Sequence, residues 1–299
     1  HTGDVINSSD IKARIKKEYG EDLTDSQYDA HLREITKKRF DIAYKIMDKF
    51  IKDLDVQQKH IVICCGNHDK CRFNAKKTKA MAFKPFQDFI RKIGCHDELT
   101  AFYDLDDLNV LVLNTNVADS KEKVTCIDCE NLRNVLDLKV KNDDELNWFY
   151  CSEKNQQASS KDDRISVIVA HQPLYDICER IRLPYGSETQ STDFLSALQD
   201  FINGNGIYLC GDKHTSSIAA SYIHDIPHYF CGHPFTEDKN TVPAKIGCKL
   251  KNFPKVQSID VDYNLIEIRD GKIGKIRKIH LSQKERGKWE CQIHPIDAV

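Results

Sequence analysis

The feature that most constrains this chain is a short polar motif at the end of an apolar run. Residues 61–65 read Ile-Val-Ile-Cys-Cys, and Gly66-Asn67-His68-Asp69 follows directly. An apolar run of this length predicts a buried strand, and open α/β sheets bind ligands just beyond the carboxyl ends of their strands. The motif would bring an amide, an imidazole and a carboxylate into one crevice, which indicates metal-dependent phosphate chemistry.

Three further segments repeat this arrangement of polar side chains next to an apolar strand. They are residues 1–7, 165–173 and 206–214. The polar side chains of interest in them are Asp4, His171, Asp212 and His214. Because the carboxyl ends of neighbouring strands meet at one edge of a sheet, we expect four strand ends to converge on one site.

The order and strand context of these motifs resemble the calcineurin-like metallophosphoesterases. That family carries, in chain order, Asp-x-His, Gly-Asp-x-x-Asp/Asn, Gly-Asn-His-Asp/Glu, a lone His after a strand, and Gly-His-x-His. The resemblance extends from residue 1 to about residue 280, and Asp69 stands where the serine/threonine protein phosphatase branch has Glu. It implies an α/β fold in which two mixed β-sheets pack as a sandwich flanked by helices, the four-layer metallophosphoesterase type.

The resemblance also implies two divalent metal ions at these strand ends. The implied ligands are Asp4 as the bridge between the ions, His214 on the first ion, and Asn67 and His171 on the second. In the family such a pair holds a hydroxide and directs it at phosphorus. The implied function is a phosphoesterase that hydrolyses a phosphomonoester or phosphodiester.

The histidine of the Gly-Asn-His motif does not bind metal in this family. By resemblance, His68 would donate a proton to the leaving oxygen or steady the charge on the phosphate. A hydrogen bond to a carboxylate would hold its ring and keep it protonated. Asp69 is the adjacent carboxylate, so His68 and Asp69 are the candidate catalytic residues, although the carboxylate that holds the ring stays open.

The chain departs from the family at Asp212, which stands where Gly-His-x-His has its first histidine, a ligand of the second metal. A carboxylate also binds metals, and its harder oxygen favours Mn²⁺ or Mg²⁺. We therefore expect two divalent ions, Mn²⁺ first, with Fe, Zn and Mg²⁺ as alternatives. The competing interpretation is a degenerate site that has lost its second metal.

A second departure is that no Asp-x-His motif precedes His1. In the family this motif ends the first strand and supplies two ligands to the first metal. A sheet without that strand would expose the edges of its neighbours. We therefore expect an N-terminally truncated chain whose first strand lies upstream of His1, with room for further domains in a larger protein.

Hydrophobic periodicity predicts the remaining elements. One or two helices are expected within residues 24–56, and others at about 82–93, after Asp144, and at about 193–203. Strands are expected at 100–104, 109–114, 217–222, 227–231, 256–261, 265–269 and 273–279, with Asp270-Gly271 as a hairpin turn. No repeat or linker is visible, so we expect a single domain over residues 1–299, with roughly 281–299 as a C-terminal extension.

The amino-acid composition indicates the general class of the protein but says little about its binding partners. With 40% apolar and 30% charged residues and a net charge of -2, the chain is typical of a soluble globular protein. Its 12 cysteines are irregularly spaced and several lie in apolar strands, which favours a reduced cytoplasmic protein over a disulfide scaffold. No apolar stretch approaches the roughly 20 residues that span a bilayer, so we expect no membrane partner.

A basic segment at residues 70–79 immediately follows the candidate catalytic pair. Lys70 and Arg72 would guide phosphates to the metals, and Phe73 would stack on a base, as in sites for single-stranded nucleic acid. The simpler interpretation is a solvated basic loop. His233 is a further candidate for the substrate cleft.

Three functions remain open at this stage. A small-molecule or cyclic-nucleotide phosphodiesterase agrees with the absence of net positive charge, and a nuclease domain of a nucleic-acid-processing or defence protein agrees with the basic segment. The expected partner is accordingly a phosphate ester, a nucleotide or a nucleic acid. A catalytically degenerate binding or regulatory module agrees with Asp212 and the absent first motif.

Overall fold

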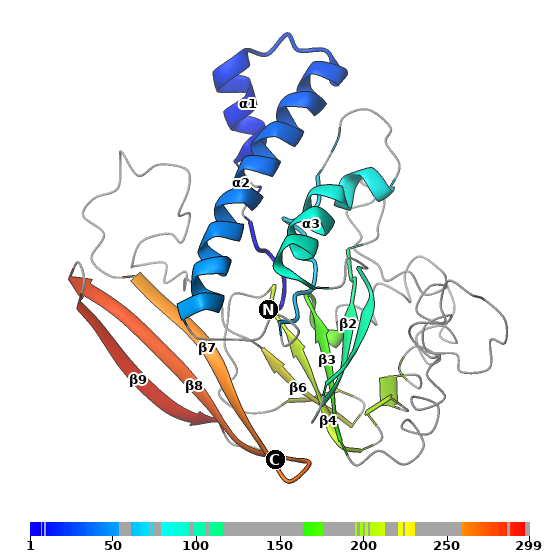
Figure 1. Cartoon of the computed structure of the whole chain (residues 1–299), viewed down its shortest axis with the longest axis vertical. Helices are drawn as coiled ribbons and strands as arrows, with labels where there is room; N and C mark the ends of the chain where they lie inside the picture. Colours follow the sequence, from blue (N-terminus) through cyan, green and yellow to red (C-terminus); the bar gives the residue numbers. More distant parts are fainter. Residues whose placement is uncertain are drawn as a thin grey trace, which may run out of the picture.

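The chain has a mixed α/β fold (Figure 1). The computed structural model describes residues 1–6, 8, 10–53, 61–71, 73, 79–95, 99–105, 108–116, 164–175, 195, 198–199, 201–202, 204–212, 221–223, 225–230, 259–285 and 288–296. Its elements are α1 (Ile11–Tyr19), α2 (Asp25–Asp53), α3 (Lys79–Ile93), β1 (Ala101–Asp104), β2 (Leu108–Leu113), β3 (Ile165–Ala170), β4 (Gly206–Cys210), β5 (Ser221–Ile223), β6 (Ile226–Phe230), β7 (Ile259–Arg269), β8 (Lys272–Glu285) and β9 (Lys288–Ile296).

The central sheet has six strands in the order β1-β2-β3-β4-β6-β5. The pairs β2-β3, β3-β4 and β4-β6 are parallel, while β1 and β5 pair antiparallel at the two edges. Every residue of β3 is buried, as expected for a parallel strand that reads as a continuous apolar run. This order places the carboxyl ends of β3 and β4 side by side, and these are the ends that precede His171 and Asp212.

The second sheet is antiparallel, in the order β7-β8-β9. Its β7-β8 turn is the predicted hairpin turn, and both turn residues, Asp270 and Gly271, have positive φ (52° and 67°) as a type I′ turn requires. No glycine or proline interrupts residues 259–269, so a single strand replaces the two that were predicted there. Within the stretch expected as an extension, β8 continues and β9 pairs with it.

Other predicted strands agree with the structure within a few residues. β1 and β2 match the segments predicted at 100–104 and 109–114, and β6 matches the segment at 227–231. The strand predicted at 217–222 is described only as β5, residues 221–223. The helix expected after Asp144 lies outside the described residues, and the described residues between 195 and 202 are helical.

The two sheets share one apolar cluster. The central sheet contributes Val110, Val112, Val167, Val169 and Ile207, and the second sheet contributes Ile276 with Ile266, Ile268 and Ile273 partly buried against it. Burial of apolar surface is the main force that holds such layers together. These residues bring the two sheets into contact. The second sheet was expected to be mixed and is antiparallel instead, because its strands follow one another along the chain with short connections.

The helices form a second apolar cluster. α2 is one helix of 29 residues rather than two, and no glycine or proline lies within it. Its Phe40 meets two rings of α3, with centroids 6.2 Å from Phe86 and 5.3 Å from Phe89. The same cluster includes Ile63 and Cys65, so the helices cover the segment that leads to the Gly-Asn-His-Asp motif.

Residues 61–65 differ from the strand predicted for them. The segment is assigned to neither sheet, although Ile63, Cys64 and Cys65 are buried. Among the described residues, its backbone forms a strand-like pair with His1: the amino group of His1 donates to the carbonyl of Val62 (2.7 Å), and the Cys64 N–H donates to the carbonyl of His1 (3.0 Å). This is the bonding pattern of a parallel pair, but a single paired residue is too short to form a strand ladder.

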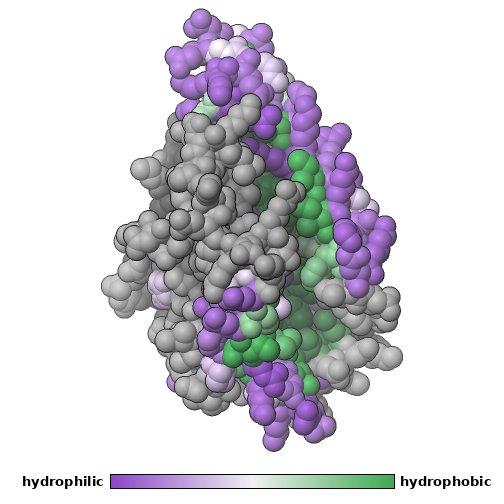
Figure 2. All heavy atoms as spheres, turned by 90° about the vertical axis from the view of Figure 1, so that its left-hand side faces the viewer, coloured by the Kyte–Doolittle hydropathy of each residue, from purple (hydrophilic) through white to green (hydrophobic). Residues whose placement is uncertain are grey.

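Some apolar side chains of α2 face solvent instead of the core. Ile42, Ile46 and Phe50 are 59%, 67% and 54% exposed and lie four residues apart, on one face of the helix. Figure 2 shows apolar surface between hydrophilic surface on the face at the left of Figure 1. Among the described residues, no helix combines the length and the apolar character that a membrane span requires.

Candidate metal centre

Three predicted ligands meet at the carboxyl ends of β3 and β4. His171 follows β3, and its Nε2 lies 3.4 Å from Oδ1 of Asp212, which follows β4. The same Nε2 lies 3.5 Å from Oδ2 of Asp4. The Gly211 N–H donates to the carbonyl of His171 (3.0 Å), which holds the two strand ends together.

The ring of His171 has the surroundings of a ligating imidazole. It is 2% exposed, and its Nδ1 donates to the carbonyl of Thr2 (2.9 Å), because a carbonyl can only accept. Its Nε2 is buried and has no hydrogen-bond partner among the described residues. Metal-binding histidines typically donate one ring N–H to a backbone carbonyl and bind with the other nitrogen.

The two distances from Nε2 of His171 match the separation of two ligands on one divalent cation. Two ligands at about 2.1 Å from a tetrahedral ion lie about 3.4 Å apart, close to the separations of Nε2 from both carboxylates. The side-chain oxygen of Asn67 is a second buried atom with no hydrogen-bond partner in the described part of the chain. Carboxylate and amide oxygens are ligand types that suit Mn²⁺ and Mg²⁺, whereas imidazole suits Zn²⁺ and Fe²⁺.

The coordination shell is not complete within the described residues. Among them, no group of three or more His, Cys, Asp or Glu side chains is arranged so that it could hold a metal ion. His214, the remaining predicted ligand, lies outside the described residues. The described geometry therefore consists of two pairs: Nε2 of His171 lies close to Asp4 and also close to Asp212.

Negative charge is concentrated around this ring. Burial lowers the pKa of His171, but Asp212, Asp4 and the carbonyl of Thr2 outweigh it and raise the pKa to about 9. Burial also raises the pKa of Asp69 to about 7, and the charge of Asp4 adds to this, while backbone N–H groups oppose it. A divalent cation beside Asp4 would offset this charge.

Both candidate carboxylate ligands have unusual backbone conformations. Asp4 and Asp212 are non-glycine residues with positive φ, 55° and 63°. Aspartate tolerates this left-handed region better than most residues, yet the conformation still costs free energy and is concentrated at functional sites. Each aspartate directly follows a glycine, so the chain turns sharply where the ligand is presented.

Two glycines allow these loops to touch. A Cβ on Gly66 would overlap the backbone nitrogen and the carboxylate of Asp4. A Cβ on Gly3, which has φ of 93°, would lie 2.7 Å from Nδ1 of His171. The close approach of residues 3–4, residue 66 and His171 thus requires glycine at both positions.

His68 is held by Ser8 and Asp4. The Ser8 N–H donates to Nδ1 of His68 (3.3 Å), and the Ser8 hydroxyl lies 3.1 Å from the same atom. Because a backbone N–H can only donate, Nδ1 is the acceptor and the ring proton of the neutral imidazole lies on Nε2. The backbone N–H of His68 donates to Oδ1 of Asp4 (2.9 Å), so the candidate ligand Asp4 is hydrogen-bonded to the candidate catalytic residue.

Asp69 binds the backbone of the two segments that carry Asp4 and Asn67. Its Oδ1 accepts the Ile6 N–H (3.1 Å) and its Oδ2 accepts the Gly66 N–H (2.8 Å). The side chain is fully buried, at 0% exposure. This geometry favours a role in positioning residues 4–6 and 66–68 over direct contact with a substrate.

Of the candidate substrate-binding residues, Lys70 is described, and Arg72 and His233 lie outside the described residues. Nζ of Lys70 donates to the carbonyl of Asn116 (3.5 Å) and lies 5.4 Å from the ring centroid of Phe83. The positively charged group of Lys70, which follows His68 by two residues in the sequence, is therefore held in place by Asn116 and Phe83.

Sequence reasoning missed Ser8 and Asn116. Asn116 is buried, its Nδ2 donates to the carbonyl of Cys65 (2.6 Å), and its Oδ1 accepts from Gln172 Nε2 (3.5 Å). It thus links the loop after residue 65 to the loop after β3. The polar residues 114–116 follow β2 as His171 follows β3, so the same strand-end rule could have found Asn116. No comparable signal in the sequence points to Ser8.

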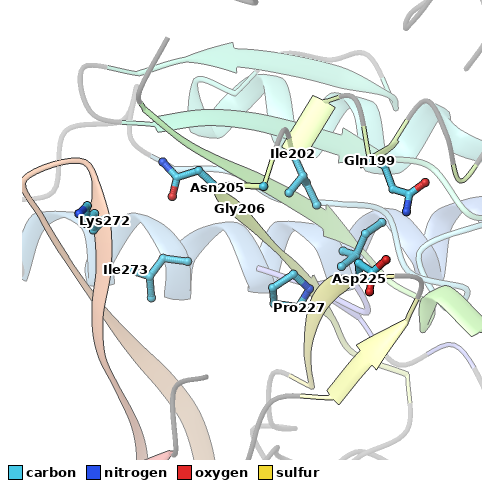
Figure 3. Close-up of a pocket in the computed structure, with 10 residues that line it drawn as sticks. Gln199, Ile202, Asn205, Gly206, Asp225, Pro227, Lys272 and Ile273 are labelled. Atoms are coloured by element: carbon cyan, nitrogen blue, oxygen red, sulfur yellow. The ribbon is translucent and has the colours of Figure 1, made fainter. Parts of the chain in front are cut away.

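The structure also contains a cavity of about 460 Å³ (Figure 3). It is lined by Gln199, Ile202, Gly204, Asn205, Gly206, Asp225, Ile226, Pro227, Lys272 and Ile273. Gly206 begins β4, whereas Asp212 follows its other end. The cavity and the candidate metal centre are therefore at opposite ends of this strand.

Comparison with known proteins gives no independent assignment. No model of a known protein family matches this chain, and no curated protein matches it. The functional proposal accordingly depends on the motifs and on the geometry of the centre.

Proposed function

We propose that this chain is a metal-dependent phosphoesterase of the calcineurin-like family. The observation that carries the proposal is the His171 ring, which is buried, fixed through Nδ1 by Thr2, and directed through an unpartnered Nε2 at two carboxylates. The unpartnered oxygen of Asn67 supports the same conclusion. The proposed cofactors are two divalent ions, Mn²⁺ first.

The residues of the chain have distinct tasks in this proposal. Asp4, Asn67, His171 and Asp212 would hold the ions, together with His214. When bound, the ions would supply Lewis-acid activation of the phosphate and of water. His68 would donate a hydrogen bond from Nε2–H to a phosphate oxygen, because its Nδ1 accepts from Ser8. This favours the charge-steadying role of His68 over proton donation to the leaving oxygen.

The proposal extends to the fold. The shared cluster of the two sheets and the packing of α2 and α3 on the segment before Gly66 support a four-layer sandwich of the metallophosphoesterase type. The fourth layer, helices on the outer face of the second sheet, is part of the proposal.

Metal binding and hydrolysis test the proposal together. We expect the protein to bind Mn²⁺ in a calorimetric titration and to hydrolyse bis-p-nitrophenyl phosphate when Mn²⁺ is present. Asp4→Asn and His171→Ala should lose both properties, since each removes a ligand atom. His294→Ala is the matched control, because His294 is exposed on β9. A wild-type protein with neither metal nor turnover would instead be a binding module that keeps the fold.

Salt dependence distinguishes the two substrate classes. A nuclease neutralises several phosphates at once, so its affinity falls steeply with salt, whereas a nucleotide substrate makes few such contacts. Turnover of a single-stranded oligonucleotide and of a cyclic nucleotide, each at 50 and 200 mM salt, would assign the class.

A further inference from the structure

Two buried polar rings lie inside the central sheet, beside the loop that carries His171. Tyr208 of β4 and His228 of β6 are direct register partners, and both are 0% exposed. Their rings stack, with centroids 5.2 Å apart and an interplanar angle of 12°. Polar groups in the interior of a strand cost free energy unless they are hydrogen-bonded, so the partners of these two side chains are informative.

Both rings bind the backbone that follows His171. The Tyr208 hydroxyl donates to the carbonyl of Gln172 (2.8 Å), and the Leu174 N–H donates to Nε2 of His228 (3.3 Å). Together with the bond from Gly211 to the His171 carbonyl, they fix three backbone groups within four consecutive residues. All three bonds come from β4, from β6 or from the loop directly after β4.

We propose that Tyr208 and His228 are positioning residues, which fix the segment from His171 to Leu174 and so direct Nε2 of His171 at Asp4 and Asp212. The inference deepens the proposed function and depends on it where metal affinity is concerned. Residues that orient a ligand in this indirect way typically change metal affinity 10- to 100-fold when replaced.

Core filling is the competing explanation for these rings, and two substitutions separate the roles. Tyr208→Phe removes the hydroxyl and keeps the stacked ring, whereas His228→Leu fills the space with an apolar side chain and removes the acceptor for Leu174. In His228→Gln the amide oxygen replaces Nε2 as the acceptor. If Tyr208 only filled the core, Tyr208→Phe would leave the affinity for Mn²⁺ unchanged. If Tyr208 positions the loop, the same substitution would weaken it.

The affinity for Mn²⁺ alone, measured by calorimetric titration of the whole chain, is the first test. We expect Tyr208→Phe and His228→Leu to bind Mn²⁺ about 10- to 100-fold more weakly than the wild type. His228→Gln should recover most of the affinity. Tyr263→Phe is the matched control, since it removes the hydroxyl of an exposed tyrosine on β7. Unchanged affinity in Tyr208→Phe and His228→Leu would overturn the inference.

Amide hydrogen exchange without added metal is the second test and separates the two proposals. The amides of Leu174 and Gly211 should exchange faster in Tyr208→Phe and His228→Leu, while the amides of β8 keep their wild-type rates. Equal protection of these two amides in every variant overturns the positioning role. A wild-type protein that binds no Mn²⁺ overturns the proposed function, and the exchange rates then still decide whether the rings hold the loop.

Discussion

Gly66 and Asp69 show how single residues build the candidate centre. Gly66 leaves room for the backbone and the carboxylate of Asp4, and Asp69 ties the N–H groups of Ile6 and Gly66 together from a fully buried position. The chain thus uses one residue without a side chain and one buried carboxyl group to bring residues 4–6 against residues 66–69. Substitutions at these positions should affect the centre even though neither is proposed as a ligand.

We expect Gly66→Ala to disrupt the centre. The added methyl group would overlap the backbone of Asp4, which cannot rotate away as a flexible side chain would. Overpacking of this kind typically costs about 1–3 kcal/mol of stability. Urea unfolding and Mn²⁺ titration measure both consequences. Gly274→Ala is the control for the loss of a glycine, since neither Gly66 nor Gly274 has a positive φ and a Cβ on Gly274 would meet nothing closer than 3.4 Å; equal effects of the two substitutions would contradict the steric argument.

Asp69→Asn should lower the free energy of unfolding by about 1–3 kcal/mol, because its amide NH₂ would face a backbone N–H and leave a buried donor without an acceptor. Urea unfolding without metal measures this change. Asp41→Asn, at a 42% exposed side chain that pairs with Lys92 on the surface, should cost much less. A stable Asp69→Asn that still lost turnover would restore the original hypothesis of a directly catalytic Asp69.

At the scale of whole elements, α2 divides its apolar side chains between the core and solvent. Phe40 is 3% exposed and packs on α3, whereas Ile46, only six residues later, is 67% exposed. The periodicity of the sequence predicted the helix but could not distinguish these two faces, because both carry apolar residues at helical spacing. The neighbour α3 decides which face is buried.

Two substitutions measure this division. Phe86→Ala in α3 should cost about 3–5 kcal/mol, because it removes a ring that is 1% exposed and contacts Phe40. Ile46→Ala should stay within about 0.5 kcal/mol, since the side chain is already mostly in water. Chemical denaturation of both variants checks the pair. A large loss in Ile46→Ala would mean that this face of α2 is covered in solution.

At the scale of the whole molecule, a buried histidine links folding to pH. Burial lowers the pKa of His228 to about 4, and its Nε2 accepts from Leu174, so the folded state holds the neutral ring. Cys210 of β4 and Tyr175, after β3, also face this ring. The unfolded chain, with an ordinary pKa of about 6.5, binds more protons between these two values.

The stability that depends on His228 should therefore be fully present above pH 6.5 and decrease as the pH falls toward 4. The decrease amounts to about 3 kcal/mol over this range, from the difference between the two pKa values. Urea unfolding of the wild type and of His228→Gln at pH 7.5, 6, 5 and 4 isolates this contribution as the difference between the two curves. Parallel curves would show that His228 does not titrate between these pH values.

The sequence by itself determined the α/β class, most elements and the donor types of the centre. These follow from local patterns: apolar runs and helical spacing predict strands and helices, and polar residues at strand ends predict ligands. The placement of His171 and Asp212 at adjacent strand ends follows the same rule. Residues 1–6 and 61–65 do not follow it, because they are not strands, and a sequence pattern does not reveal whether a pairing partner is present.

Only the tertiary structure decided which side chains meet. Thr2 fixes the ring of His171 across 169 residues, and Ser8 reaches His68 across 60. Asp69 binds the backbone of Ile6 and Gly66 rather than the imidazole beside it in sequence. Such contacts depend on how loops from distant segments cross, and that is set by the packing of the sheet and of α2 and α3, because periodicity along the chain carries no information about partners far away in sequence.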